Sequence, residues 1–136
     1  MRKLTACFTE HNVKIILDTH VFLWCLAQPE KLSALQRIEV ESLANVVYVS
    51  SVSIAELMIK SSIGKIEINF NPVTKATECG FELLDFCADD ALLLGKLPFY
   101  HRDPFDRMLI CQGIRKRHPE FNHIGLSELL RVVQFY

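Results

Sequence analysis

The sequence predicts an α/β fold in which a central, mainly parallel β-sheet is flanked by helices. Two observations indicate this class. Short apolar runs typical of buried strands, at residues 13–17, 46–49 and 81–86, alternate with longer segments of helical character. Strands separated by helices in this way form right-handed βαβ units, whose helices pack on the sheet. At 136 residues the chain has the length of one such domain.

Local signals place the individual elements. The first strand is nearly all β-branched or aliphatic, and Asp18 and Thr19 follow it with capping oxygens for a helix that ends before Pro29. Gly64 is expected to stop the third helix, and Gly80 to stop the fourth. Ile66–Ile68 either pairs briefly with the sheet or crosses its surface. The expected helices cover residues 21–26, 33–44, 53–63, 72–79, 88–97 and 105–116.

Composition excludes several classes of protein. Half of the residues are hydrophobic and 23% are charged, which argues against both a disordered chain and a membrane protein. The longest apolar run, Val21–Ala27, is far shorter than the roughly 20 residues that a membrane span needs. The net charge is −1, so no global basic field attracts nucleic acid. Binding of a polyanion would have to come from local clusters or from a bound metal.

The cysteines and the N-terminus indicate a cytoplasmic protein. Five cysteines form no CxxC pair and no zinc-site spacing, so we expect reduced thiols that serve as small core residues. Residues 1–13 do not resemble a signal peptide and are expected to be an extension ahead of a single domain at 14–136.

Acidic residues follow the predicted strands or begin the next helices. Asp18 comes directly after the first strand, Glu56 follows the second, and Asp103 and Asp106 begin the last predicted helix. In parallel sheets ligands bind beyond the carboxyl ends of the strands. Carboxylates gathered at one such edge repel each other and favour a hard cation such as Mg²⁺ or Mn²⁺. These four acids are therefore candidates for a metal site.

Each acid also has a purely structural interpretation. Ser53 and Glu56 have the spacing of a capping box, in which Glu56 would accept a hydrogen bond from the Ser53 backbone N–H. Asp103 before Pro104 is nearly the same device, and Asp18 could be a simple N-cap. Spacing alone leaves the metal site and the capping roles both open.

Three segments resemble the motifs of PIN-domain ribonucleases of the VapC toxin type. They are Ile16–Trp24 (ILDTHVFLW), Val49–Leu57 (VSSVSIAEL) and His101–Ile110 (HRDPFDRMLI), and their order and separation also fit over residues 14–113. The resemblance implies a PIN-like three-layer sandwich with a central, mainly parallel sheet. It also implies an Mg²⁺- or Mn²⁺-dependent endoribonuclease that cleaves RNA with a metal-activated water.

The resemblance assigns roles to particular residues. The metal-binding and catalytic acids would be Asp18, Glu56 and Asp106, with Asp103 as an auxiliary acid beside them. Thr19 or Ser50 would orient a carboxylate or a metal-bound water. The usual partners would be a small antitoxin protein, which inserts a basic residue into the groove, and a second copy of the chain.

The C-terminal part, residues 114–136, departs from the family pattern. The family usually places a short strand and then Thr or Ser, one residue and Asp after the third motif, whereas no Asp follows Asp106 here. The best substitute is Glu128 as a further metal ligand, and Glu120 is a weaker candidate. The alternative function is therefore a catalytically weakened or inactive PIN fold that binds an antitoxin or RNA.

Two arginines on the last predicted helix are candidates for RNA binding. Arg107 and Arg115 could hold phosphates, or they could belong to a solvated helix face whose cations suit the helix dipole. A haloacid-type phosphatase is disfavoured because it needs an Asp-x-Asp pair, whereas Asp18 is followed by Thr19 and His20. A phospho-acceptor receiver needs an acidic pair and a late lysine, which the sequence does not supply.

Overall fold

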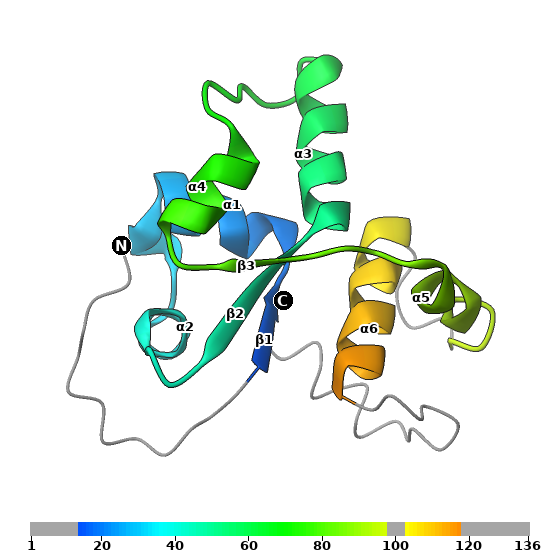
Figure 1. Cartoon of the computed structure of the whole chain (residues 1–136). Helices are drawn as coiled ribbons and strands as arrows, with labels where there is room; N and C mark the ends of the chain where they lie inside the picture. Colours follow the sequence, from blue (N-terminus) through cyan, green and yellow to red (C-terminus); the bar gives the residue numbers. More distant parts are fainter. Residues whose placement is uncertain (1–13, 98–102, 118–136) are drawn as a thin grey trace.

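The computed structural model describes residues 14–97 and 103–117 (Figure 1). Within them, strands β1 (Lys14–Leu17), β2 (Val46–Ser50) and β3 (Glu82–Leu84) form a sheet in the order β1-β2-β3. Both strand pairs are parallel, with Leu17 opposite Val49 and Val49 opposite Leu83. The carboxyl ends of the strands therefore meet at one edge, and the predicted α/β class is confirmed. The expected N-terminal extension, residues 1–13, and residues 118–136 of the divergent segment lie outside the described residues.

Each predicted helix is present, with shifted ends. The helices are α1 (Thr19–Ala27), the short 3-10 helix η1 (Pro29–Lys31), α2 (Ala34–Glu41), α3 (Ser51–Ser62), α4 (Pro72–Glu78), α5 (Ala88–Leu93) and α6 (Pro104–Arg117). Gly64 and Gly80 follow α3 and α4 with φ of +77° and +80°, a left-handed conformation that favours glycine. The two glycine stops are thus confirmed.

The largest differences from the predicted element boundaries are in α2, α5 and β3. Helix α5 ends at Leu93 rather than residue 97. Helix α2 ends at Glu41 rather than residue 44, where Asn45 Nδ2 donates to the Glu39 carbonyl and side-chain oxygens and the chain turns. Strand β3 is shorter than predicted because the chain leaves the sheet after Leu84, and the Phe86 N–H donates to Ser51 Oγ instead. Of the two alternatives for residues 66–68, the structure has the surface crossing: the segment forms no strand, and its two isoleucines pack against the core from outside the sheet.

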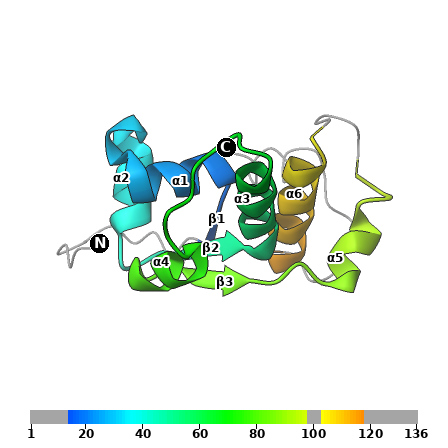
Figure 2. The ribbon, with the colours of Figure 1, turned by 90° about the horizontal axis from the view of Figure 1, so that it is seen from above.

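Helices cover both faces of the sheet, which makes the three layers of the sandwich (Figures 1 and 2). Side chains alternate between faces along a strand. Val47 and Val49 point into the larger core cluster with side chains of α1, α2, α3 and α4. Tyr48, between them, faces the other way, and Lys116 of α6 lies over its ring at 4.9 Å. A smaller apolar cluster joins α5 to α6 through residues such as Leu93 and Ile110.

Three of the cysteines are buried, as predicted, and one is not. Cys25, Cys79 and Cys111 are core residues, and burial raises the pKa of the Cys25 thiol to about 12. The prediction is wrong for Cys87, which is exposed because it stands at the N-cap of α5. Cys7 lies outside the described residues. No helix in the described part of the chain has the length and apolar character needed to cross a membrane.

Candidate active site

Asp18 stands at the carboxyl end of β1 and begins α1. Its Oδ1 accepts a hydrogen bond of 2.7 Å from the Val21 N–H, which confirms the N-cap interpretation. The residue is nevertheless only 8% exposed, an unusual degree of burial for an aspartate that caps a helix. A cap needs one carboxylate oxygen, so the capping role does not prevent the second oxygen from serving as a ligand.

Glu56 is buried in the second turn of α3, and it is not part of a capping box. The helix begins at Ser51 because the Ser50 hydroxyl accepts from the Val52 N–H at 3.0 Å, which makes Ser50 the N-cap. The capping-box interpretation of Glu56 is therefore wrong. Its carboxylate is held by two side chains instead. Thr19 Oγ1 donates to Oε1 at 2.6 Å, and Lys60 Nζ lies 2.7 Å from Oε2.

The two acids share one electrostatic environment. Burial raises the pKa of the Asp18 carboxyl above its ordinary value, and the negative charge of Glu56 raises it further. The Val21 N–H and the charge of His20 act in the opposite direction, but burial is the largest cause. Carboxylate oxygens are the ligands that hard divalent cations prefer, so the two acids are candidate ligands for such an ion.

Thr19 links the two acids through the backbone and its side chain. As the first residue of α1 it follows Asp18 directly, and its hydroxyl reaches across to α3. The hydroxyl oxygen also lies 3.2 Å from Ser53 Oγ, so the contact is buried among polar groups. This geometry suits the carboxylate-orienting role expected for Thr19. The hydroxyl of Ser50 is engaged elsewhere, since it donates to Gln112 Oε1.

The acids of the third motif lie at the start of α6. Asp103 is exposed and its Oδ1 accepts from the Phe105 N–H at 2.8 Å, which confirms its capping interpretation. Asp106 is half-buried in the first turn of α6, a helix that contacts both β1 and α3. Among residues 14–97 and 103–117, no three His, Cys, Asp or Glu side chains lie together in a metal-binding arrangement. The structure thus places Asp18 near enough to Glu56 for their charges to interact, whereas Asp106 belongs to α6, which packs against β1 and α3.

Two further predicted ligands cannot be placed. Glu128 and the weaker candidate Glu120 lie outside the described residues, as do His101 and Arg102 of the third motif.

Arg107 and Arg115 connect α6 to α5. Arg107 Nη2 donates to two backbone carbonyls near the end of α5, those of Leu94 and Leu97, both at 3.3 Å. Arg115 Nη1 lies 3.0 Å from Asp90 Oδ1, and only 23% of the arginine side chain is exposed. These contacts favour a packing role. RNA binding by either arginine stays a prediction.

Three polar residues of the region are not among the site residues that the sequence predicts: Lys60, Ser53 and Gln112. The spacing of Glu56 and Lys60, four residues apart on one helix, is a signal that predicts an ion pair. The sequence predicts a capping-box role for Ser53, whereas in the structure its hydroxyl lies beside that of Thr19. Gln112 is 2% exposed and bonds both Ser50 on β2 and the Leu84 carbonyl on β3. No local pattern in the sequence indicates a contact between residues 62 positions apart.

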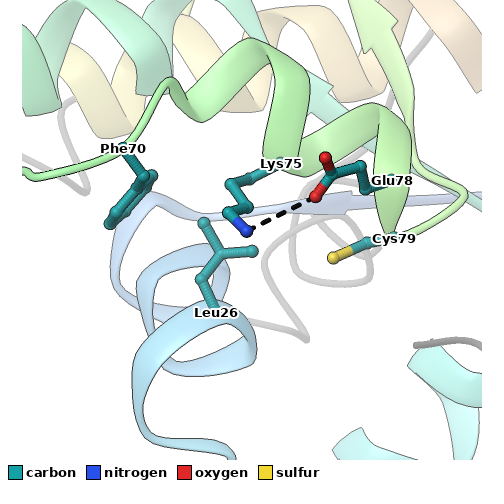
Figure 3. Close-up of a pocket in the computed structure, with 5 residues that line it drawn as sticks. All are labelled: Leu26, Phe70, Lys75, Glu78 and Cys79. Atoms are coloured by element: carbon teal, nitrogen blue, oxygen red, sulfur yellow. Dashed lines mark ion pairs between the residues drawn. The ribbon is translucent and has the colours of Figure 1, made fainter.

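A hollow of about 320 Å³ lies away from these acids, between α1 and α4 (Figure 3). Its lining consists of Leu26, Phe70, Lys75, Glu78 and Cys79. The carboxylate of Glu78 faces Lys75, at 3.4 Å, in an exposed ion pair. Because its single acid is already paired and none of the predicted site residues line it, this hollow does not compete with the acid pair as the candidate active site.

Comparison with known protein families identifies the chain. The sequence model of one family, described as the PIN domain, matches residues 15–119, which is most of the chain, so the protein belongs to the PIN domain family. PIN domains are generally nucleases, and they typically use divalent metals. The match includes the stretches that carry Asp18, Glu56 and Asp106. A comparison with curated proteins gives no match.

Proposed function

We propose that this PIN-domain protein is an Mg²⁺- or Mn²⁺-dependent endoribonuclease of the VapC toxin type. The observation that carries the proposal is the buried pair of acids at the carboxyl edge of the sheet. Asp18 and Glu56 come from segments far apart in the sequence, and Glu56 has no helix-capping role that would explain its burial. Burying two acids whose charges repel each other costs stability unless a cation accompanies them. Lys60 offsets one negative charge of the pair, and a divalent ion would balance both.

The proposed ligands are Asp18, Glu56 and Asp106, with Glu128 as a further ligand and Asp103 as an auxiliary acid. When bound, the divalent ion would supply a water nucleophile at neutral pH and offset charge on the scissile phosphate. The residues of this chain orient the site. The N–H of Val21 fixes one oxygen of Asp18, and the Thr19 hydroxyl fixes one oxygen of Glu56. Such preorganised groups need no rearrangement at the moment of reaction.

The proposed biological context follows the family subtype. The substrate is RNA, the partner is a small antitoxin that covers the acid edge with a basic residue, and the chain acts in the cytoplasm as a homodimer. The net charge of −1 supports RNA binding that depends on a bound metal cation, because the chain as a whole does not attract a polyanion.

The test is cleavage of a structured RNA by the purified protein in Mn²⁺ and in EDTA. We expect cleavage that EDTA abolishes and that Asp18→Asn, Glu56→Gln or Asp106→Asn lowers on the order of 10²-fold. Glu67→Gln is the matched control, because it neutralises an exposed acid in the loop between α3 and α4. Equal cleavage by the parent and the three site variants would show that another site or a contaminant cuts the RNA.

A catalytically inactive PIN fold that binds an antitoxin or RNA is the second candidate. The observation in its favour is the ion pair between Lys60 and Glu56, which neutralises one acid without a metal. Calorimetric titration with Mn²⁺ separates the two. Binding that Asp106→Asn abolishes supports the nuclease, whereas RNA binding without Mn²⁺ binding or cleavage supports the inactive fold.

A further inference from the structure

Lys60 is in direct contact with the candidate metal site. It lies one turn after Glu56 on α3, and its Nζ is 2.7 Å from Glu56 Oε2. The two side chains differ in burial, since that of Glu56 is 5% exposed and that of Lys60 is 32% exposed. The ammonium group therefore reaches from a partly solvated position to an oxygen that is almost fully buried.

The two carboxylate oxygens of Glu56 have different partners, and Oε2 is the one that contacts a cation. Its other oxygen, Oε1, accepts the Thr19 hydroxyl at 2.6 Å. Asp18 lies near enough for the two charges to interact: burial raises the pKa of the Asp18 carboxyl, and the negative charge of Glu56 raises it further. A carboxylate oxygen in contact with an ammonium cannot also coordinate a divalent ion without placing two cations side by side. Repulsion between such close charges is strong in a poorly solvated site.

We infer that Lys60 is the resident counter-cation of the acid pair, and that a divalent ion must displace it from Glu56 Oε2 in order to bind. The inference rests on the proposed metal site, and it adds that this chain sets the affinity for the ion with one of its own side chains. Displacement is sterically simple, because a lysine ammonium is carried on a flexible four-carbon stem and that of Lys60 already touches solvent. The divalent ion binds only where its attraction to the acids exceeds that of the ammonium.

The direct test is the affinity of the full chain for Mn²⁺, measured by calorimetry with the parent and Lys60→Met. Methionine keeps an unbranched side chain on the helix and removes the competing charge. We expect Lys60→Met to bind Mn²⁺ about tenfold more tightly, which corresponds to about 1.4 kcal/mol, because the ion no longer has to displace an ammonium. Lys60→Arg retains a cation and should bind Mn²⁺ as the parent does, within about twofold.

Lys75→Met is the matched control. Lys75 is also an ion-paired helical lysine, with Glu78 at 3.4 Å, but it lies on α4 away from the acid pair. It changes the net charge by the same amount as Lys60→Met, so a general electrostatic effect would tighten Mn²⁺ binding in both variants. We expect the Mn²⁺ affinity of Lys75→Met to equal that of the parent.

A second measurement needs no calorimetry and tests the metal-free protein. In EDTA, Lys60→Met should melt at a lower temperature than the parent, because Glu56 loses its counter-ion beside Asp18. Saturating Mn²⁺ should then raise the melting temperature of Lys60→Met by more than it raises that of the parent. If Lys60→Met does not fold, Lys60→Gln replaces it, because an amide can still donate to Oε2 without carrying charge.

The outcomes separate the inference from the proposed function. If the parent binds Mn²⁺ and the neutral variants of Lys60 bind it equally or more weakly, Lys60 does not compete for Glu56, and the metal site stands without it. If neither the parent nor any variant binds Mn²⁺, there is no metal site and the inference fails together with the proposed function.

Discussion

Removing the hydroxyl of Thr19 should destabilise the protein, because Glu56 loses one of its two side-chain partners. In Thr19→Val the side chain keeps its shape, but Glu56 Oε1 loses its donor at 2.6 Å. Both residues are buried, with exposed fractions of 5% and 4%, so water does not easily replace the lost partner. A hydrogen bond to a charged group contributes about 1.5–3 kcal/mol. Because Lys60 still compensates Oε2, we expect a loss of about 2 kcal/mol in the free energy of unfolding.

The assay is urea unfolding at neutral pH in EDTA, followed by circular dichroism, with thermal melting in parallel. For a chain of this length about 2 kcal/mol corresponds to a fall of roughly 7 °C in the melting temperature. Thr77→Val is the matched control. Thr77 is an exposed helical threonine whose hydroxyl donates to the Val73 carbonyl at 3.1 Å, and its loss should cost no more than about 0.5 kcal/mol. A Thr19→Val variant as stable as Thr77→Val would show that the contact with Glu56 contributes nothing to the fold.

Three further predictions concern stability. Burial raises the pKa of Asp18, so stability from its protonated form is present below its ordinary pKa of 3.8 and is lost as the pH rises through the folded-state pKa. Asp18→Asn keeps a capping side chain without the charge, and we expect it to melt higher than the parent at pH 7 in EDTA, with the gain shrinking toward pH 3. Gln112→Leu should lower the free energy of unfolding by about 1–3 kcal/mol in urea, because Ser50 and the Leu84 carbonyl lose a buried partner. Leu57→Ala should cost about 2–5 kcal/mol in the same assay, since Leu57 is 1% exposed in the larger core cluster; a loss below 1 kcal/mol would contradict that placement.

The sheet and the helices could be predicted because their signals are local. The apolar run at β1 specifies a buried strand, and Gly64 specifies a helix stop through its own backbone freedom. The ends of helices are harder to predict where two residues could serve as the same cap. Both Ser50 and Ser53 could cap α3, and the structure uses Ser50, which shifts the helix start by two residues and moves Glu56 from a cap into the interior.

The candidate site was only partly predictable from the sequence. Asp18 and Glu56 were identified because each follows a strand, and the parallel topology places strand ends at one edge. Their fixed geometry depends on contacts across the fold, such as that of Thr19 with a residue 37 positions away. Lys60 could be predicted from the sequence only in part. Its pairing with Glu56 follows from local helical spacing, but its importance becomes visible only when Glu56 is known to be buried beside another acid.

The balance of charge at the acid pair links the metal to substrate binding. One ammonium against two carboxylates leaves surplus negative charge, and a chain with a net charge of −1 offers no wider attraction for a phosphate. On the proposed function, a divalent ion balances the charges of both Asp18 and Glu56. The positive charge of Lys60 is then no longer neutralised by these acids. The site changes from repelling phosphate to attracting it. RNA should therefore bind to this edge only after the divalent ion has bound. Neutralising Lys60 should strengthen binding of the divalent ion and weaken binding of RNA.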